Sequence, residues 1–331
     1  MRKRSTLALI CLGSLVLAVG IAERTLRWID YPRHGCGRLT DPSELRVVRF
    51  DEELGWSYIP RHSAVGDNHA RYTFSRAGYR AADSEDAPDA ARPAKVLLVG
   101  DSMLFGHGLE YRDTFGHKLQ ERLDARLGAR HEVLNFAVQA YGTDQTALML
   151  RRVLTRFSPE VIVVDFIGEH LARNVSEDRR ELFPCLRFLG TKPRFELEGD
   201  RLRLGSRPEL FAVYDDPRVR LLFRRALAGP VDRRVARTGV AITRALLAEI
   251  QHLAAERESA LFLLSFANAA ETDAVNPGIP AAVVEWETPE NRGYFLSDTD
   301  HHPNAAATTM LVDRLLEIAA AGFAQGSRRA R

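Results

Sequence analysis

The sequence predicts an α/β fold, a three-layer α/β/α sandwich with a central parallel sheet, preceded by an N-terminal transmembrane or signal helix. Continuous apolar runs such as KVLLVG at 95–100 are typical of strands that are covered on both faces. Segments with apolar residues at helical spacing separate these runs. Strands that alternate with helices in this way indicate a parallel sheet with helices on both faces.

The alternation predicts four strands and four helices. The strands are expected at residues 95–100, 131–138, 161–168 and 260–267. The helices are expected at residues 113–127, 143–157, 235–257 and 305–320. The stretch 174–232 is rich in Arg, Pro and Gly and breaks the rhythm, with a hairpin expected at 195–204. We therefore interpret 174–232 as an insertion.

The first 29 residues predict a membrane anchor. Three basic residues at positions 2–4 precede the uncharged stretch 6–22, a pattern shared by signal peptides and short membrane helices. The apolar pattern continues past Glu23, which favours an uncleaved anchor over cleavage near residue 20. Basic residues on the short N-terminal side leave the rest of the chain outside the cytoplasm. We expect an inner-membrane anchor with the main domain in the periplasm or extracellular space, or a secreted protein if the helix is cleaved.

These patterns divide the chain into three parts. Residues 1–29 form the anchor, 30–94 a lead-in segment with short strands, and 95–331 the α/β domain that contains the insertion. The net charge is +2, and arginine is interleaved with acidic residues, so no nucleic-acid partner is expected. Whether Cys36 and Cys185 pair, and the oligomeric state, are left open.

Polar residues gather where the expected strands end, which is where open α/β sheets bind ligands. Ser102 directly follows the first strand, and the segment SDTDHHPN at 297–304 precedes the last helix. A serine nucleophile needs a histidine base that a carboxylate orients, and this segment holds both residue types. Read singly, Ser102 is equally a turn residue and the acidic segment a helix cap. Their order along the chain favours catalysis.

Several segments together resemble the SGNH (GDSL) hydrolases, in particular the membrane-anchored bacterial type associated with cell-surface polysaccharide modification. The matching segments are GDS at 100–102, LNFAVQAYGTDQ at 134–145, VIVVDFIGEHLARN at 161–174 and DTDHHPN at 298–304, with FDEELGWSYIP and TFSRAGYR upstream. The resemblance covers most of residues 50–320 and is weakest over the insertion. It implies an SGNH/flavodoxin-like sandwich.

The resemblance also implies roles for single residues. Ser102 is the nucleophile, and its own backbone N–H belongs to the oxyanion hole. His302 is the base, because the family histidine is commonly followed by Pro-Asn, and Asp300 is its carboxylate partner. The alternative pairing is His301 with Asp298.

Two positions depart from the family pattern. Ala140 stands where the family has an oxyanion-hole glycine, and an alanine still donates its N–H unless the backbone needs a positive φ. Glu169 stands where an asparagine side chain is expected. An ionised carboxylate repels a developing oxyanion, whereas loss of one donor alone costs about 2.7–4 kcal/mol in a well-studied protease.

The resemblance implies a serine-dependent ester hydrolase that acts on O-acetyl groups of a carbohydrate or polysaccharide. The alternatives are an O-acyltransferase with the same acyl-enzyme, and a catalytically impaired protein that binds glycan or serves envelope assembly. No cofactor is expected. No metal is expected either, because the spacing of His107, His117 and His170 matches no ligand pattern.

Overall fold

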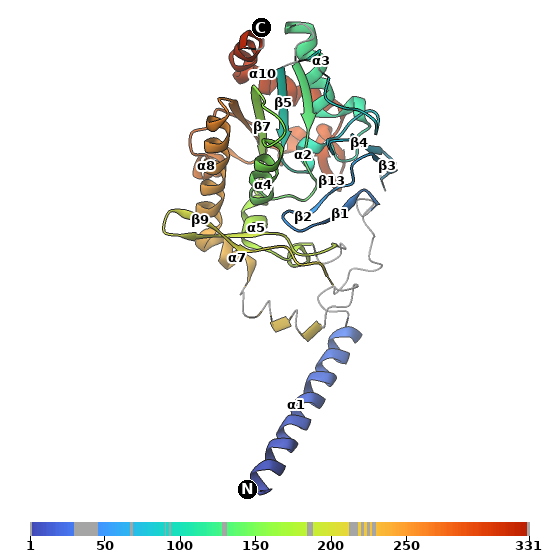
Figure 1. Cartoon of the computed structure of the whole chain (residues 1–331), viewed down its shortest axis with the longest axis vertical. Coiled ribbons are helices and arrows are strands. Elements are labelled where there is room, and N and C mark those ends of the chain that lie inside the picture. Colours follow the sequence, from blue (N-terminus) through green and yellow to red (C-terminus); the bar gives the residue numbers. More distant parts are fainter. Residues whose placement is uncertain are drawn as a thin grey trace.

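A five-stranded parallel sheet forms the centre of the computed structural model (Figure 1). Its strands are β5 (Ala94–Val99), β6 (His131–Asn135), β7 (Val161–Phe166), β10 (Ala260–Ser265) and β11 (Ala281–Val283). They lie in the order β11-β10-β7-β5-β6, and every neighbouring pair is parallel. The chain steps from β5 to β6 on one side and then to β7 on the other. The carboxyl ends of β5 and β7 therefore flank the crevice in which such sheets bind ligands.

The structure describes most of the chain with several gaps. The described residues are 2–29, 46–66, 69–89, 91–92, 94–127, 131–183, 188–211, 218–219, 222–223, 226 and 230–329. The side chains of residues 2–9 and 325–329 are not among those described. Cys36 and Cys185 lie outside the described residues, so their pairing stays open.

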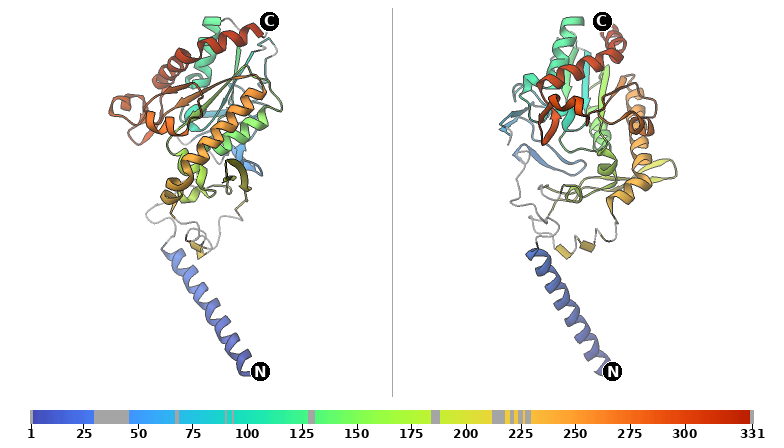
Figure 2. Two further views of the ribbon diagram at one scale, coloured as in Figure 1. Left: turned by 90° about the vertical axis from the view of Figure 1, so that its left-hand side faces the viewer. Right: turned by 180° about the vertical axis from the view of Figure 1, so that it is seen from behind.

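Helices cover both faces of the sheet (Figure 2). On one face α3 (Phe115–Leu127) packs against α10 (Ala305–Arg329), and on the other α4 (Thr143–Val153) packs against α8 (Val240–Glu256). Their buried faces carry apolar residues at helical spacing, such as Leu119 and Leu123 of α3. Together they bury the strands so completely that Val96, Leu97, Leu98 and Val99 of β5 are fully inaccessible. The predicted sandwich with a central parallel sheet is confirmed.

The shorter elements lie mainly around the rim of the sheet. The helical ones are α2 (Ser102–Phe105), η2 (Tyr111–Asp113), α5 (His170–Val175), η3 (Arg179–Glu181), α7 (Val231–Arg234), the π-helical turn η4 (Val235–Gly239), α9 (Ala269–Val275) and η5 (Pro289–Tyr294). The hairpins are β8 (Arg194–Glu198) with β9 (Arg201–Ser206), which is the expected hairpin, and β12 (Phe295–Ser297) with β13 (Asp300–Pro303).

All four expected strands and helices are present, with shifted ends. Each strand ends before its predicted end, by at most three residues, because the residues that follow form loops with polar side chains. The predicted helix at 235–257 begins with a π-helical turn before α8. Strand β11 is missing from the predictions, because three residues are too few for a periodicity to show.

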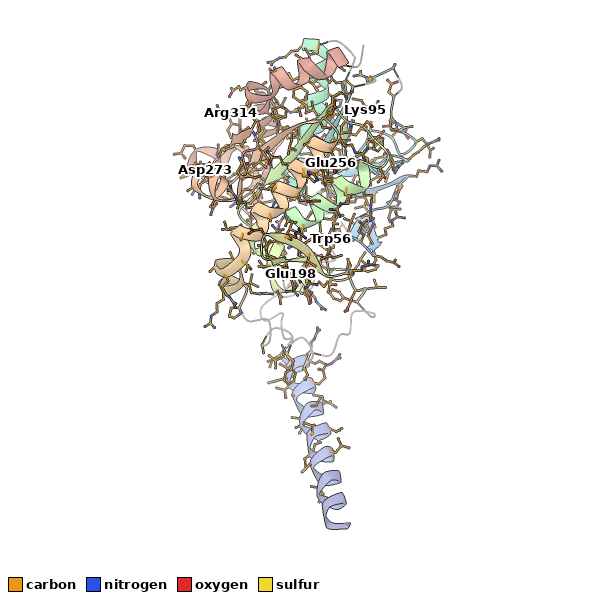
Figure 3. All side chains as sticks on the ribbon, turned by 60° about the vertical axis from the view of Figure 1, so that its left-hand side comes forward. Trp56, Lys95, Glu198, Glu256, Asp273 and Arg314 are labelled. Atoms are coloured by element: carbon orange, nitrogen blue, oxygen red, sulfur yellow. The ribbon has the colours of Figure 1, made fainter. Side chains whose placement is uncertain are left out.

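The lead-in segment packs against the carboxyl end of the sheet. It forms β1 (Val48–Asp51) paired with β2 (Gly55–Tyr58), and β3 (His62–Val65) paired with β4 (Arg71–Phe74). Its aromatic side chains join the core, where the rings of Tyr58 and Phe74 stack at 4.0 Å and Phe105 of α2 adds to the stack. Trp56 lies among the packed side chains inside the body of the protein (Figure 3). Burial of these rings fastens the lead-in segment to α2.

The N-terminal helix α1 (Arg2–Trp28) extends away from the rest of the molecule (Figure 1). Its apolar side chains from Ile10 to Ile21 are largely exposed. Within the described part of the chain, no helix has both the length and the apolar character that crossing a membrane requires. The membrane anchor expected for residues 1–29 thus gains no support from the described residues.

Candidate active site

Ser102 stands at the carboxyl end of β5, where the chain turns into the short helix α2. Gly100 is required before it, because a Cβ at this position would overlap with the carboxylate of Asp165 on β7. Asp101 caps α2, and its side chain accepts a 2.8 Å hydrogen bond from the backbone N–H of Met103. Each residue of the GDS segment thus has a structural reason at this junction.

Asp101 is also the centre of a buried polar cluster beneath Ser102. Its carboxylate accepts hydrogen bonds from Arg173 at 2.7 Å and His170 at 3.3 Å, and its backbone N–H donates to Asp165. Burial alone would raise the pKa of Asp101, but the hydrogen bond from His170 and the charge of Arg173 hold that pKa well below its usual range. Burial, followed by the Asp101 charge, raises the pKa of Asp165. The cluster therefore rigidly anchors the residue before the nucleophile.

The hairpin β12–β13 brings His302 to Ser102. Nε2 of His302 lies 2.8 Å from Oγ of Ser102, and Nδ1 lies 2.6 Å from Oδ1 of Asp300. A carboxylate only accepts, so Nδ1 carries the proton and Nε2 accepts the Ser102 hydroxyl. This is the relative arrangement of nucleophile, base and orienting carboxylate that serine-dependent acyl transfer needs.

The alternative pairing is not assembled. His301 is exposed, its Nδ1 lies 2.7 Å from Oε2 of Glu287, and its Nε2 meets only the backbone oxygen of Asp298 at 3.3 Å. The hydrogen bond with Glu287 raises the pKa of His301. Residues alternate in direction along β13, so His301 faces away from Ser102 when His302 faces toward it.

A second histidine, His107, reaches the same carboxylate. Its Nε2 lies 3.5 Å from Oδ2 of Asp300, and its ring centre is 4.3 Å from that of His302. Hydrogen bonds from His107 and then from His302 hold the pKa of Asp300 well below its usual range. The sequence marked His107 only as an unassigned histidine, because nothing in the spacing from 107 to 300 reveals the contact.

A cavity of about 760 Å³ opens at Ser102 and His302. Phe266 and Trp286 form part of its apolar wall, and the residues after β7 supply Glu169 and Arg173. Further carboxylates on the lining come from Glu271, Glu285 and Glu287. A concave site with apolar walls and a few convergent polar groups is the usual form of a small-molecule site.

Ala140 lies in the loop after β6 with a φ of 61°, in the left-handed region. Its carbonyl oxygen accepts a 2.7 Å hydrogen bond from Arg179, and that of the next residue, Tyr141, accepts one from Arg173 at 2.9 Å. These two arginines fix the loop in its strained conformation. The glycine of the family pattern thus corresponds to a real conformational demand, which the alanine meets at a cost.

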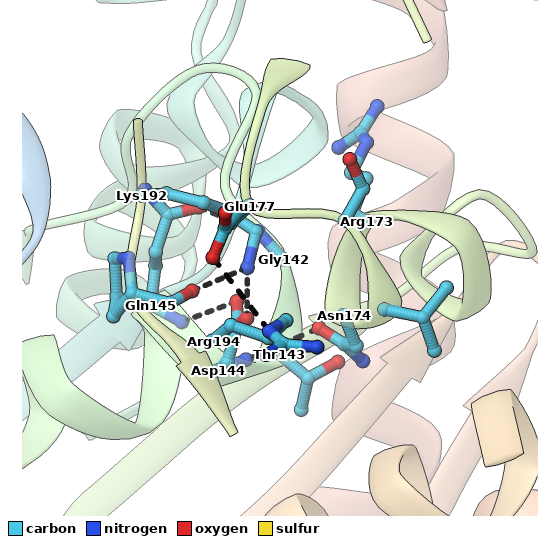
Figure 4. A network of polar contacts seen from close by, with 12 residues as sticks. Gly142, Thr143, Asp144, Gln145, Arg173, Asn174, Glu177, Lys192 and Arg194 are labelled. Carbon is cyan, nitrogen blue, oxygen red and sulfur yellow. Dashed lines mark hydrogen bonds and ion pairs between the residues drawn. The ribbon is translucent and has the colours of Figure 1, made fainter. Parts of the chain in front are cut away.

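The same loop is supported from behind by a buried polar network (Figure 4). Lys192, from the segment after α5, pairs with Asp144 of α4, and Asn174 accepts a 3.3 Å hydrogen bond from the backbone N–H of Asp144. Burial lowers the pKa of Lys192 to about 8. Gln145 accepts from the N–H of Gly142 at 3.2 Å. The first part of the insertion is therefore joined to the start of α4 by buried polar contacts.

Glu169 lines the cavity and is exposed there. Its side chain makes no hydrogen bond or ion pair with another residue in the described part of the chain. The neighbouring His170 is fully buried and contacts Asp101 and Thr143. The cavity thus holds a carboxylate where the family pattern has an amide, and the lining residue Arg173 pairs with Asp101.

Two groups of side chains have the composition of a metal site. His107, Asp300 and His302 offer ligand atoms within 4.8 Å of one another, and so do Asp101, Asp165 and His170. In the first group these atoms already serve the Ser102–His302–Asp300 arrangement, so a metal there would compete with the hydrogen bond between His302 and Asp300. The second group is fully buried.

The chain matches no family model, and no curated protein matches it either. Solved structures resemble it at low identity. TesA is 15% identical, with 69% of this chain and 99% of that chain covered at a TM-score of 0.40. A family 3 carbohydrate esterase from Clostridium thermocellum is 13% identical (70% and 98% covered, TM-score 0.41), and the acetyl xylan esterase AlAXEase is 12% identical (67% and 98% covered, TM-score 0.38).

A further solved structure that resembles this chain is a lipolytic protein of the G-D-S-L family from Desulfitobacterium hafniense (9% identical, 68% and 99% covered, TM-score 0.37). At this level of similarity the likeness concerns the course of the chain alone.

Proposed function

We propose that the protein is a serine-dependent acyl-ester hydrolase that removes O-acetyl groups from a carbohydrate. The observation that carries this proposal is the continuous hydrogen-bonded line from Ser102 Oγ through His302 to Asp300, with distances of 2.8 and 2.6 Å. The line ends in a cavity that is open to solvent and large enough for a sugar ester.

In the proposed reaction Ser102 attacks the ester carbonyl carbon while His302 takes the hydroxyl proton. The backbone N–H of Ser102 lies in the first turn of α2 and supports the oxyanion. His302 returns the proton to the leaving alcohol, and an acyl-enzyme remains on Ser102. Water, deprotonated by His302, then attacks the acyl-enzyme; acetate leaves, and the oxygen of Ser102 takes the proton back from His302. Asp300 holds the imidazole in the required tautomer throughout.

The carbohydrate part of the proposal is supported by the character of the cavity. Its lining combines aromatic side chains, Phe266 and Trp286, with carboxylates that accept hydrogen bonds from hydroxyl groups. A long apolar slot would instead favour a lipase, and the carboxylates beside Ser102 are unsuited to one. An O-acyltransferase uses the same acyl-enzyme, with a sugar hydroxyl in place of water.

The test is covalent labelling of residues 46–331 with a fluorophosphonate probe. We expect labelling of the wild-type fragment and none of Ser102→Ala, and His302→Ala should label at least 100-fold more slowly. The fragment keeps the whole sheet and the four strands of the lead-in segment, and circular dichroism establishes that each variant is folded. A folded wild-type fragment that stays unlabelled would leave Ser102 without activation and favour the glycan-binding alternative.

A positive result leads to substrate assays. Acetylated mono- and oligosaccharides are compared by release of acetate, with an unacetylated sugar added as acceptor. Release of acetate into water supports the hydrolase, whereas transfer of acetyl to the acceptor identifies the transferase.

We further propose, from the basic residues at positions 2–4 alone, that the catalytic domain lies outside the cytoplasm, in the periplasm or the extracellular space. Alkaline phosphatase fused after residue 331 should be active with the full chain and inactive once residues 1–29 are removed. An inactive full-length fusion, with the fusion protein present in the cell, contradicts this location.

A further inference from the structure

A chain of polar contacts links the lead-in segment to Asp300. Gln139 donates from its amide nitrogen to Nδ1 of His107, and His107 in turn faces Asp300, with 3.5 Å between Nε2 and Oδ2. On its other side, Oε1 of Gln139 accepts a 3.0 Å hydrogen bond from the hydroxyl of Tyr58 on β2. Asp300 is therefore held through both of its oxygens, by His302 on one and by His107 on the other.

The donors and acceptors along this chain determine the protonation of His107. Tyr58 donates to the oxygen of Gln139, so the amide nitrogen of Gln139 points toward His107. An amide nitrogen only donates, so Nδ1 of His107 must be the acceptor and Nε2 must carry the proton. That proton points at Asp300, the one partner in the chain that only accepts. Neutral His107 is thus matched to ionised Asp300.

The backbone around His107 is held by the same segment. Arg80 of the lead-in segment donates a 2.9 Å hydrogen bond to the carbonyl of Gly106 and a second bond to that of Leu109. The hydroxyl of Tyr72 on β4 accepts from the N–H of Gly108 at 2.9 Å. The backbone on both sides of His107, at Gly106, Gly108 and Leu109, is therefore held by side chains of the lead-in segment.

Gln139 is fixed as firmly as His107. Its carbonyl oxygen accepts from the indole N–H of Trp56 at 3.1 Å, and its own N–H donates to the hydroxyl of Tyr58 at 3.2 Å. Gln139 is buried, and it directly precedes the strained residue Ala140. Fixed surroundings of this kind keep a catalytic group within the narrow range of productive geometry.

We propose that His107 is a positioning residue that holds Asp300 against His302, and that the lead-in segment is part of the catalytic apparatus through Tyr58 and Gln139. The inference rests on the proposed function. The Asp300 side chain is one-third exposed, so without His107 its second oxygen would turn to water. Among the titratable groups in the described part of the chain, Asp300 and His302 face His107.

The first measurement compares His107→Phe with His107→Gln. Phenylalanine keeps the ring and removes the donor, whereas the amide nitrogen of glutamine reaches about as far as Nε2 and still donates. We expect kcat of His107→Phe to fall by roughly 10- to 100-fold with little change in KM. The acid limb of its pH–rate profile should move to higher pH, because an unshared Asp300 charge holds the proton on His302 more tightly. His107→Gln should recover most of both effects.

The second measurement does not depend on turnover. The proton between His302 Nδ1 and Asp300 gives a far-downfield proton NMR signal, which Asp300→Ala assigns by its loss. We expect this signal to shift or broaden in His107→Phe and to return toward its wild-type position in His107→Gln. Tyr58→Phe, which removes only a hydroxyl, should shift it in the same direction by less.

These outcomes separate the two proposals. A folded His107→Phe protein with an unchanged NMR signal overturns the positioning role, whatever its activity. An unlabelled Ser102 with a signal that responds to His107 leaves the positioning role standing and removes the proposed hydrolase. If His107→Phe fails to fold, Tyr58→Phe and His107→Gln decide the matter through the same signal, and a wild-type signal in Tyr58→Phe then counts against the proposal.

Discussion

Ala140 has a side chain but holds a backbone conformation that favours glycine. Its φ of 61° is costly for a residue with a Cβ, by about 1–2 kcal/mol. Ala140→Gly removes this strain while it keeps the N–H, although the added freedom of the unfolded chain offsets part of the gain. We expect the free energy of unfolding to rise by about 0.5–1 kcal/mol. Urea unfolding measures it, and an unchanged or lower midpoint contradicts strain at this residue.

Substitution of Glu169 is expected to change activity and not stability. Its carboxylate lines the cavity beside Ser102 and has no partner that would neutralise it among the described residues. Glu169→Gln removes the charge, and Glu169→Asn restores the residue of the family pattern. We expect kcat/KM of the glutamine variant to rise about tenfold, which is about 1.4 kcal/mol in the barrier. A fall in both variants, with stability unchanged, would show that the carboxylate takes part in the reaction.

At the scale of elements, the contact between β5 and β7 decides where the nucleophile stands. Gly100→Ala places a methyl group against Asp165, which is fully buried and cannot move aside. We expect a loss of about 1–3 kcal/mol in the free energy of unfolding. The double variant Gly100→Ala, Asp165→Ala makes room for the methyl group, so its loss should be clearly smaller than the sum of the single losses. If the two single losses of unfolding free energy simply add in the double variant, the methyl group does not clash with Asp165.

The sequence predicts the parts of the site that depend on neighbouring residues, but not those that depend on contacts between distant segments. The strands of the sheet core and the position of Ser102 follow from local patterns, since apolar runs and turn residues are neighbours along the chain. The Pro-Asn after His302 already favoured it over His301, whereas the direction of the two side chains follows from the pairing of β13 with β12. The contacts of Tyr58 and Gln139 with His107 join segments far apart in the sequence, so no spacing reports them. Arg173 and Arg179 carried no signal for the same reason.

For the molecule as a whole, buried histidines make stability depend on pH. Burial lowers the pKa of His131 and of His170, so the folded chain stays neutral there when the unfolded chain takes up protons near pH 6.5. The unfolded state then binds more protons, and stability falls as the pH falls below about 6.5. Asp165 acts in the opposite sense, because its raised pKa keeps a proton on the folded state. A variant of one histidine therefore tests the sign of its contribution better than the pH dependence of stability of the wild type alone.

His131→Gln is that variant, because the amide nitrogen of glutamine can still donate to the carbonyl of Phe323, which Nε2 of His131 contacts at 3.2 Å. Between pH 7.5 and 5 we expect the wild type to lose more unfolding free energy than His131→Gln. Denaturant unfolding at both pH values measures the difference. Equal losses would mean that His131 takes up its proton in the folded state as readily as in the unfolded one.

The charge of the cavity gives the last prediction, which concerns the substrate. Loops from distant parts of the chain bring Glu169, Glu271, Glu285 and Glu287 to its lining, against the single cation Arg173 among the described lining residues. A cleft of one sign lowers the local concentration of ligands of that sign. We expect an anionic acetyl ester to react more slowly than a neutral one of the same size and leaving group. This difference in rate, the gap, should narrow as salt is raised toward 1 M. Glu271→Gln, which is remote from the hydrogen bonds of His302, should narrow the gap at low salt. A gap that is absent at low salt, or that salt leaves unchanged, would mean that Arg173 and bound water already neutralise these carboxylates, and selection would then rest on the shape of the aromatic wall.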